Sequence, residues 1–111
     1  MKVDYSSLCT INGEMETKVP IMDRGLAYGH GVFETIRISA GHSLLLDFHV
    51  NRLINGAKIL GISIDKTSIE TYFYDLIKLS PSEGIIKIII TAGSSQRGYA
   101  YSKPVDTCYI M

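Results

Sequence analysis

The chain has 111 residues, nearly half of them hydrophobic, and eleven basic residues balance eleven acidic ones. This length and composition predict one folded domain with a real core. A net charge of zero, without any cluster of lysine or arginine, excludes the electrostatic footprint of a nucleic-acid-binding protein or of one that binds an anionic membrane. The net charge does not exclude the binding of small charged ligands.

The sequence shows no targeting or membrane-spanning segment. The N-terminal residues lack the apolar stretch of a signal peptide, and the longest apolar run, 85–90, is interrupted by Lys87 and is too short to span a bilayer. We therefore expect a cytoplasmic protein with no membrane partner. Cys9 and Cys108 have no Cys or His at metal-ligand spacing beside them, so we expect two free thiols and no metal site.

The first predicted element is a hairpin. Strands over 5–11 and 14–19 flank Asn12-Gly13, a dipeptide that supplies the positive φ angles of a type I′ turn. Three glycines in 23–31 then predict a shaped loop rather than a helix. Two further strands, 32–39 and 43–46, are separated by a turn at 40–42.

Two amphipathic helices follow. Helical spacing of apolar residues predicts the first from a cap at Asp47 to Gly61, and its stripe facing the sheet consists of Val50, Leu53, Ile54, Ala57 and Leu60. The second begins near Thr67, which forms a capping box with Glu70, and it stops at 80–81. Its apolar face consists of Ile69, Tyr72, Phe73, Leu76 and Ile77.

The C-terminal part predicts two more strands. The β-branched run 84–91 is typical of a central strand covered on both faces, and 105–111 is a last strand inside which the chain ends. We expect residues 1–111 to be one domain that continues into a further one. Strands and helices in this order predict an α+β fold, a two-layer sandwich in which a mostly antiparallel sheet carries two helices.

Two arginines are candidates for binding an anion. Arg52 lies beside the apolar stripe of the first helix, with Gly56 leaving room near its guanidinium, and such a fork of donors suits a phosphate or carboxylate. Arg97 lies in the loop GSSQRGYAY, where flexible residues and tyrosines surround one positive charge. The alternatives are a solvated helix arginine and an ordinary surface loop.

The other candidate residues indicate a function less specifically than these two arginines. Glu34 and Arg37 lie three apart in one strand, so they point to opposite faces and cannot pair. We interpret Glu34 as a residue with a structural partner across the sheet, the alternative being exposure to solvent. Tyr28 and Phe33 flank the glycine loop and either line a pocket or complete the core. His30, His42 and His49 form no arrangement that supports nucleophilic catalysis or metal ligation.

The stretches DRGLAYGHGVFETIR (23–37) and FHVNRLINGAKILGI (48–62), with the turn at Gly41, resemble the N-terminal half of class IV aminotransferases. These fold-type-IV pyridoxal-phosphate enzymes include branched-chain and D-amino-acid aminotransferases and aminodeoxychorismate lyase. The shared pattern is an acidic-Arg-Gly start, an aromatic-Gly-Asp-Gly loop, Phe or Tyr before Glu, and a His-x-x-Arg-Leu helix. His30 departs from it, because it stands where the family has aspartate.

The resemblance implies roles for four residues. Arg52 matches the arginine that binds the phosphate of pyridoxal phosphate. Tyr28 and Phe33 match positions that line the substrate pocket. Arg97 lies where some members bind a substrate carboxylate. In the family such loop residues serve the active site of the neighbouring subunit, so the resemblance implies a homodimer with a small amino substrate.

The family's covalent cofactor lysine and the glutamate that pairs with the pyridine nitrogen belong to a second domain. No lysine of this chain lies in the matching context: Lys2, Lys18, Lys58, Lys66, Lys78, Lys87 and Lys103. We therefore expect no catalytic residue in these 111 residues and no covalent cofactor chemistry by the chain alone. A non-catalytic folding or dimerisation module is the alternative.

Within the family, the FETIR strand, the LLLDFHVNRL junction and the TAGSSQRGY loop look most similar to aminodeoxychorismate lyase. That enzyme releases pyruvate and forms 4-aminobenzoate, a step of folate biosynthesis. A class IV aminotransferase for branched-chain or D-amino acids is the alternative, because both reactions use the same cofactor and this half of the site.

Overall fold

The computed structural model of the chain describes residues 8–95 and 106–111. Within them a five-stranded sheet is accompanied by three helices, in the order β1 (Thr10–Ile11), β2 (Glu14–Met15), α1 (Arg24–Tyr28), β3 (Gly31–Ile38), α2 (Leu46–Ile59), α3 (Lys66–Leu79), β4 (Gly84–Thr91) and β5 (Cys108–Ile110). Arg97 and the rest of 96–105 lie outside the described residues.

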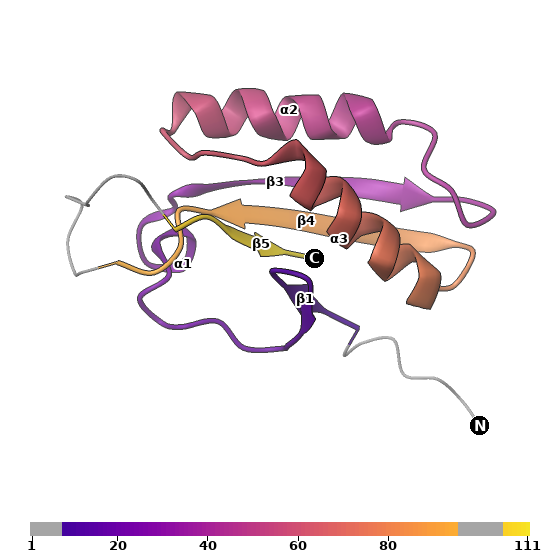
Figure 1. The fold of residues 1–111 in the computed structure, drawn as a ribbon, viewed down its shortest axis with the longest axis horizontal. Coiled ribbons are helices and arrows are strands. Elements are labelled where there is room, and N and C mark those ends of the chain that lie inside the picture. The colour runs from indigo at the N-terminus through magenta and orange to yellow at the C-terminus, as the bar shows by residue number, and fades with distance from the viewer. Residues whose placement is uncertain (1–7, 96–105) are drawn as a thin grey trace.

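The sheet has the strand order β2-β1-β5-β4-β3, and every neighbouring pair is antiparallel. Figure 1 shows α2 running along β3 and α3 crossing the sheet beside it, so the two long helices form one layer over the strands. The α+β two-layer sandwich predicted from the sequence is confirmed. Since β3 ends the strand order, one of its edges has no strand partner in the described part of the chain.

The core lies between the sheet and the two helices. Alternate residues of β3 and β4 point into it because successive side chains of a strand face opposite ways. Ile36 on β3 and Ile88 on β4 are completely buried there, against Val50 of α2 and Phe73 of α3. The predicted apolar faces of both helices are confirmed except at Leu60, which is the C-cap of α2 and is 38% exposed.

The other face of the sheet is open in the described structure. Phe33 is 62% exposed and Ile85 69% exposed, and both point away from the helices. Among the described residues only one face of 84–91 is covered, contrary to the prediction: apart from Lys87, its β-branched residues form one packed face and one exposed apolar face.

The strands predicted beside the turn at 12–13 and after the turn at 40–42 differ from those observed. Asn12 and Gly13 adopt φ angles of 53° and 83°, as the type I′ turn requires, but the flanking strands are only two residues long. The predicted strand at 43–46 is wrong, because the chain turns through an isolated bridge between Ser39 and His42 and enters α2 at Leu46.

Both helix starts differ from the predicted caps. Helix α2 begins with Leu45 as its cap and Asp47 lies in its first turn, where its charge favours the helix dipole. Helix α3 is capped by Asp65, which accepts a hydrogen bond from the backbone nitrogen of Thr67, so the predicted capping box is wrong. A carboxylate two residues before a free N–H is the better acceptor here.

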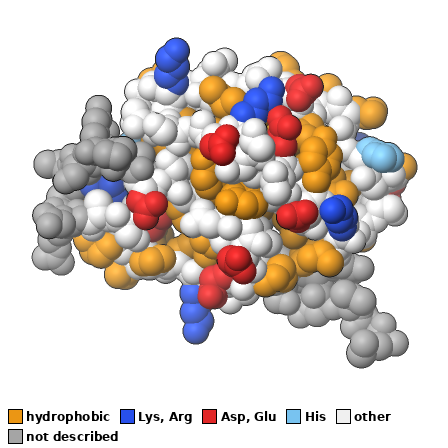
Figure 2. Space-filling view, viewed as in Figure 1, with side chains coloured by type: hydrophobic (Ala, Val, Ile, Leu, Met, Phe, Trp, Pro, Cys, Tyr) orange, Lys and Arg blue, Asp and Glu red, His pale blue; other side chains and the backbone are white. Residues whose placement is uncertain are grey.

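Among the described residues, no helix has the length and hydropathy that crossing a membrane would require. On the face seen in Figure 2, acidic and basic side chains are interspersed with apolar ones rather than gathered by sign.

Candidate functional site

Glu34 lies at the centre of a polar cluster between β3 and α2. It occupies a position of β3 that points toward the helix, and it is only 8% exposed. Nε of Arg52 forms an ion pair with its Oε1 at 2.9 Å, and Nδ1 of His49 lies 2.9 Å from its Oε2. The structural partner predicted for Glu34 therefore exists, but it comes from the helix above the strand and not from across the sheet. Arg37 points to the opposite face, as predicted.

Arg52 combines a fixed stem with an exposed end. Its side chain is 60% exposed, and its guanidinium carbon lies 5.5 Å from the ring centre of Phe48, one helical turn earlier. Because Nε is used by Glu34, both terminal nitrogens of the fork remain for an anion such as phosphate.

Gly56 serves the packing of α2 rather than space around Arg52. A Cβ atom at this position would lie 3.1 Å from Cγ1 of Val32, closer than ordinary contact. The helix therefore approaches β3 closely because residue 56 has no side chain. The interpretation of Gly56 as room for the guanidinium is corrected accordingly.

Phe33 lies on the other side of β3 from Arg52. Its ring lies 4.7 Å from Nζ of Lys87 on the neighbouring strand, a cation–π contact on the open face. It also lines a cavity of about 460 Å³, together with Leu26, Ile89 and Ile110 among others. Since Phe33 and Arg52 occupy opposite faces of an edge strand, a ligand in contact with both would lie along the free edge of β3.

Tyr28 does not line that cavity. Its ring packs on the guanidinium of Arg24, with 4.8 Å between the guanidinium carbon and the ring centre. Arg24 is 2% exposed and donates from its terminal nitrogen to the hydroxyl of Ser95 at 3.0 Å. The structure thus brings Phe33 to a cavity and leaves Tyr28 beside a buried arginine.

The segment 23–31 contains a short helix, contrary to the prediction of a loop. Asp23 caps α1 by accepting from the backbone nitrogens of Gly25 and Leu26, at 2.8 and 3.2 Å, and Gly29 ends the helix with a φ of 67°. The sequence predicts these glycines to form a loop. At Gly25, however, glycine is required because a Cβ atom there would fall against the side chain of Thr91.

His30 joins this segment to the end of α2. Nε of Arg24 donates to its Nδ1 at 3.1 Å, and its Nε2 lies 2.8 Å from the carbonyl oxygen of Leu60. An acceptor at Nδ1 and a donor at Nε2 define the neutral Nε2–H tautomer. Aspartate could accept from Arg24 but could not donate to Leu60, so the imidazole makes a connection that the usual family residue does not.

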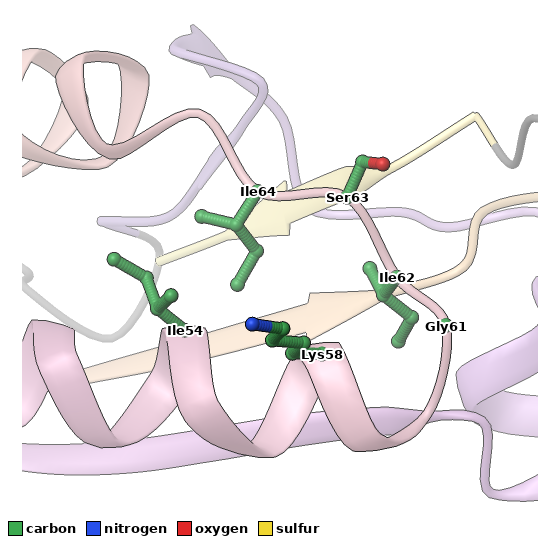
Figure 3. Close-up of a pocket in the computed structure, with 6 residues that line it drawn as sticks. All are labelled: Ile54, Lys58, Gly61, Ile62, Ser63 and Ile64. Carbon is green, nitrogen blue, oxygen red and sulfur yellow. The ribbon is translucent and has the colours of Figure 1, made fainter.

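A second cavity, of about 340 Å³, lies between α2 and the connection to α3. Figure 3 shows Ile54 and Lys58 on α2 facing Ile62 and Ile64 of the connection, with the nitrogen of Lys58 among these apolar side chains. Arg52, Tyr28 and Phe33 do not line this cavity.

Among the ionisable groups of the described residues, those of Cys108 and Tyr109 on β5 have shifted pKa values. Burial, and secondarily the charge of Asp23, raises the pKa of the Cys108 thiol, which therefore stays protonated. Burial also raises the pKa of Tyr109, whose hydroxyl accepts from the backbone nitrogen of Asp65 at 2.9 Å. Cys9 and Cys108 are both free thiols. No group of three metal-ligating side chains occurs in residues 8–95 and 106–111.

Residues 31–111 match the amino-transferase class IV family. The chain belongs to this family. It is 35% identical over 112 aligned residues to aminodeoxychorismate lyase of Bacillus subtilis, covering 90% of this chain and 38% of that protein. D-alanine aminotransferase of Bacillus licheniformis is 33% identical over 89 residues, covering 78% of this chain and 31% of the relative.

A solved structure supports the same placement. The 4-amino-4-deoxychorismate lyase of Pseudomonas aeruginosa has a TM-score of 0.83 and 33% identity, covering 92% of this chain and 37% of that enzyme. The chain thus spans less than two fifths of the relatives it matches. Class IV aminotransferases are pyridoxal-phosphate enzymes.

Two features of the site were missed by sequence reasoning. In the sequence Lys87 only interrupts an apolar run, whereas the register of β3 and β4 places it opposite Thr35 on the face of Phe33. Arg24 was not singled out, although a buried arginine is rare enough to indicate a special environment. The pairing of β3 with β4 would have been needed to find the first of these.

Proposed function

We propose that this chain forms the N-terminal part of a pyridoxal-phosphate-dependent enzyme. The observation that carries the proposal is the Arg52 fork, fixed at Nε by buried Glu34 and open at both terminal nitrogens. A dianionic phosphate ester suits such a fork, because it accepts two parallel charge-assisted hydrogen bonds. The donor set therefore fits the phosphate of the family's cofactor.

The roles of the individual side chains follow from their places. Arg52 would hold the phosphate at the free edge of β3, and Phe33 would present an apolar wall for the substrate on the open face. Arg97, by its match to the family pattern, would bind a substrate carboxylate, and Tyr28 would act indirectly by packing on Arg24. When bound, the cofactor withdraws electrons from the amine-bearing carbon of the substrate.

The reaction that the relatives favour is that of aminodeoxychorismate lyase, which forms 4-aminobenzoate and pyruvate. Both the Bacillus subtilis relative and the Pseudomonas aeruginosa structure carry this activity in their names and align with about nine tenths of the chain. Transamination of D-amino acids or branched-chain amino acids is the second candidate, supported by the D-alanine aminotransferase relative. We further propose a homodimer, as the family resemblance implies.

One assay separates the two reactions. The full-length protein, loaded with pyridoxal phosphate, is given aminodeoxychorismate, and pyruvate is followed with lactate dehydrogenase; parallel reactions contain D-alanine or leucine with 2-oxoglutarate. We expect pyruvate release and only slow transamination. Fast transamination without pyruvate release from aminodeoxychorismate would replace the lyase by an aminotransferase, and a protein that binds no pyridoxal phosphate would refute the proposal as a whole.

A further inference from the structure

Glu34 makes contacts that a merely structural carboxylate would not need. Both of its oxygens are occupied, Oε1 by Nε of Arg52 and Oε2 by Nδ1 of His49, each at 2.9 Å. An ionised carboxylate can only accept, so Nδ1 of His49 carries a hydrogen. The buried charge is therefore stabilised by two donors from one face of α2, three residues apart.

The contact with Arg52 is made through Nε alone. An ion pair at Nε restrains the guanidinium beside the buried carboxylate, while the side chain is still 60% exposed and can offer its terminal nitrogens to an anion. The Phe48 ring restrains the same group from the helix side. An exposed arginine without such contacts would sample many rotamers. Binding an anion would restrict it to one of them, at a cost in conformational entropy.

From this geometry we propose that Glu34 is a positioning residue, which orients Arg52 for a phosphate monoester and is itself held by His49. The inference rests on the proposed function, since it takes the phosphate of the cofactor as the ligand of Arg52.

Charge and orientation predict opposite effects of removing Glu34. The carboxylate cancels much of the positive charge of Arg52, so a purely electrostatic view predicts that its removal strengthens phosphate binding. Orientation predicts that removal weakens binding, because the fork is no longer fixed before the ligand arrives. The sign of the change therefore identifies the role.

The test measures the phosphate preference of the full-length enzyme, defined as the Kd for pyridoxal divided by the Kd for pyridoxal 5′-phosphate. Both ligands share the ring and the aldehyde, so the ratio isolates the phosphate. Titrations followed by absorbance are made with the wild type, Glu34→Ala, Glu34→Gln and Arg52→Ala. Urea unfolding reports the fold of each variant, and Glu70→Ala, which removes an exposed carboxylate of α3, serves as the control.

We expect Arg52→Ala to abolish most of the preference and Glu34→Ala to lower it roughly tenfold, the loss of about one charge-assisted hydrogen bond. Glu34→Gln should retain more of it, because a side chain of the same shape keeps a polar oxygen beside Nε of Arg52. In the Arg52→Ala background, Glu34→Ala should lower the preference no further. If Glu34→Ala does not fold, the comparison of Glu34→Gln with the wild type still gives the sign.

An unchanged or increased preference in both Glu34 variants would overturn the positioning role while leaving the cofactor proposal intact. A wild type that binds both ligands equally, or an Arg52→Ala variant with unchanged preference, would instead remove Arg52 as the phosphate ligand and the inference with it.

Discussion

The hydroxyl of Thr91 donates a 2.7 Å hydrogen bond to Oδ2 of Asp23, which ties β4 to the residue that caps α1. The two residues are 3% and 2% exposed. With Oδ1 engaged by two backbone N–H groups, this bond completes the environment of a buried carboxylate. It holds the segment before β3 against the strand beside it.

Replacing Thr91 by valine tests that bond. The substitution preserves shape but leaves Oδ2 of Asp23 without this donor and the backbone N–H of Gly93 without its acceptor at 3.0 Å, so we expect the free energy of unfolding to fall by about 1–3 kcal/mol. Urea denaturation gives the value. Thr35→Val, at an exposed position of β3, is the control and should change it by less than about 0.5 kcal/mol. Equal effects of the two substitutions would show that the bond contributes nothing.

A methyl group at Gly25 should not fit. Its Cβ would fall against Cγ2 of Thr91 and lie 2.9 Å from the Thr91 Cβ, so Gly25→Ala should cost about 1–3 kcal/mol despite the better helix propensity of alanine. Thr91→Ser removes the obstructing methyl and keeps the hydroxyl, so the same alanine should cost less in that background. Gly84→Ala, where the nearest atom is 4.0 Å away, is the control. Additive effects of the first two substitutions would contradict the clash.

His30→Asn should loosen the connection between the segment 23–31 and the end of α2. The shorter amide can accept from Arg24, but it does not reach the carbonyl oxygen of Leu60, which His30 contacts at 2.8 Å. We expect a loss of about 0.5–1.5 kcal/mol in unfolding free energy, measured by urea denaturation. His42→Asn, at an exposed turn position, should have almost no effect. A neutral result at His30 would mean that the Leu60 contact is dispensable.

Tyr109→Phe should change stability and its alkaline pH dependence together. Losing the hydroxyl leaves the Asp65 N–H without its acceptor, at a cost of about 1 kcal/mol near pH 7. Since burial raises the folded-state pKa of Tyr109 above its usual 10, the folded protein retains the proton more tightly, and stability is lost as the pH rises from about 10 through the folded-state value. Unfolding curves between pH 7 and 11 should therefore decline less steeply for the variant. The part of the decline that persists is expected from Cys108, whose pKa is raised in the same direction.

Local chemistry explains which parts of the fold were predictable. The Asn12-Gly13 turn follows from backbone angles that few residues adopt, and α2, α3 and β4 follow from the spacing of their apolar residues. Some of the predictions that failed are also local: the strand at 43–46 and the caps at Asp47 and Thr67 each had a competing residue within a few positions. Which of the neighbouring residues begins or ends an element depends on tertiary packing, which sets where the chain leaves the core.

For the site, the sequence by itself determined the family and the candidates Arg52 and Phe33, because the motif keeps these residue types at fixed spacing. Only the tertiary structure decided that Glu34 is bound by Arg52 and His49, and that Phe33 and Arg52 flank a free strand edge. The physical reason is that alternation along a strand fixes which residues share a face, whereas the order of strands and the helix covering each face depend on contacts between residues far apart in the chain.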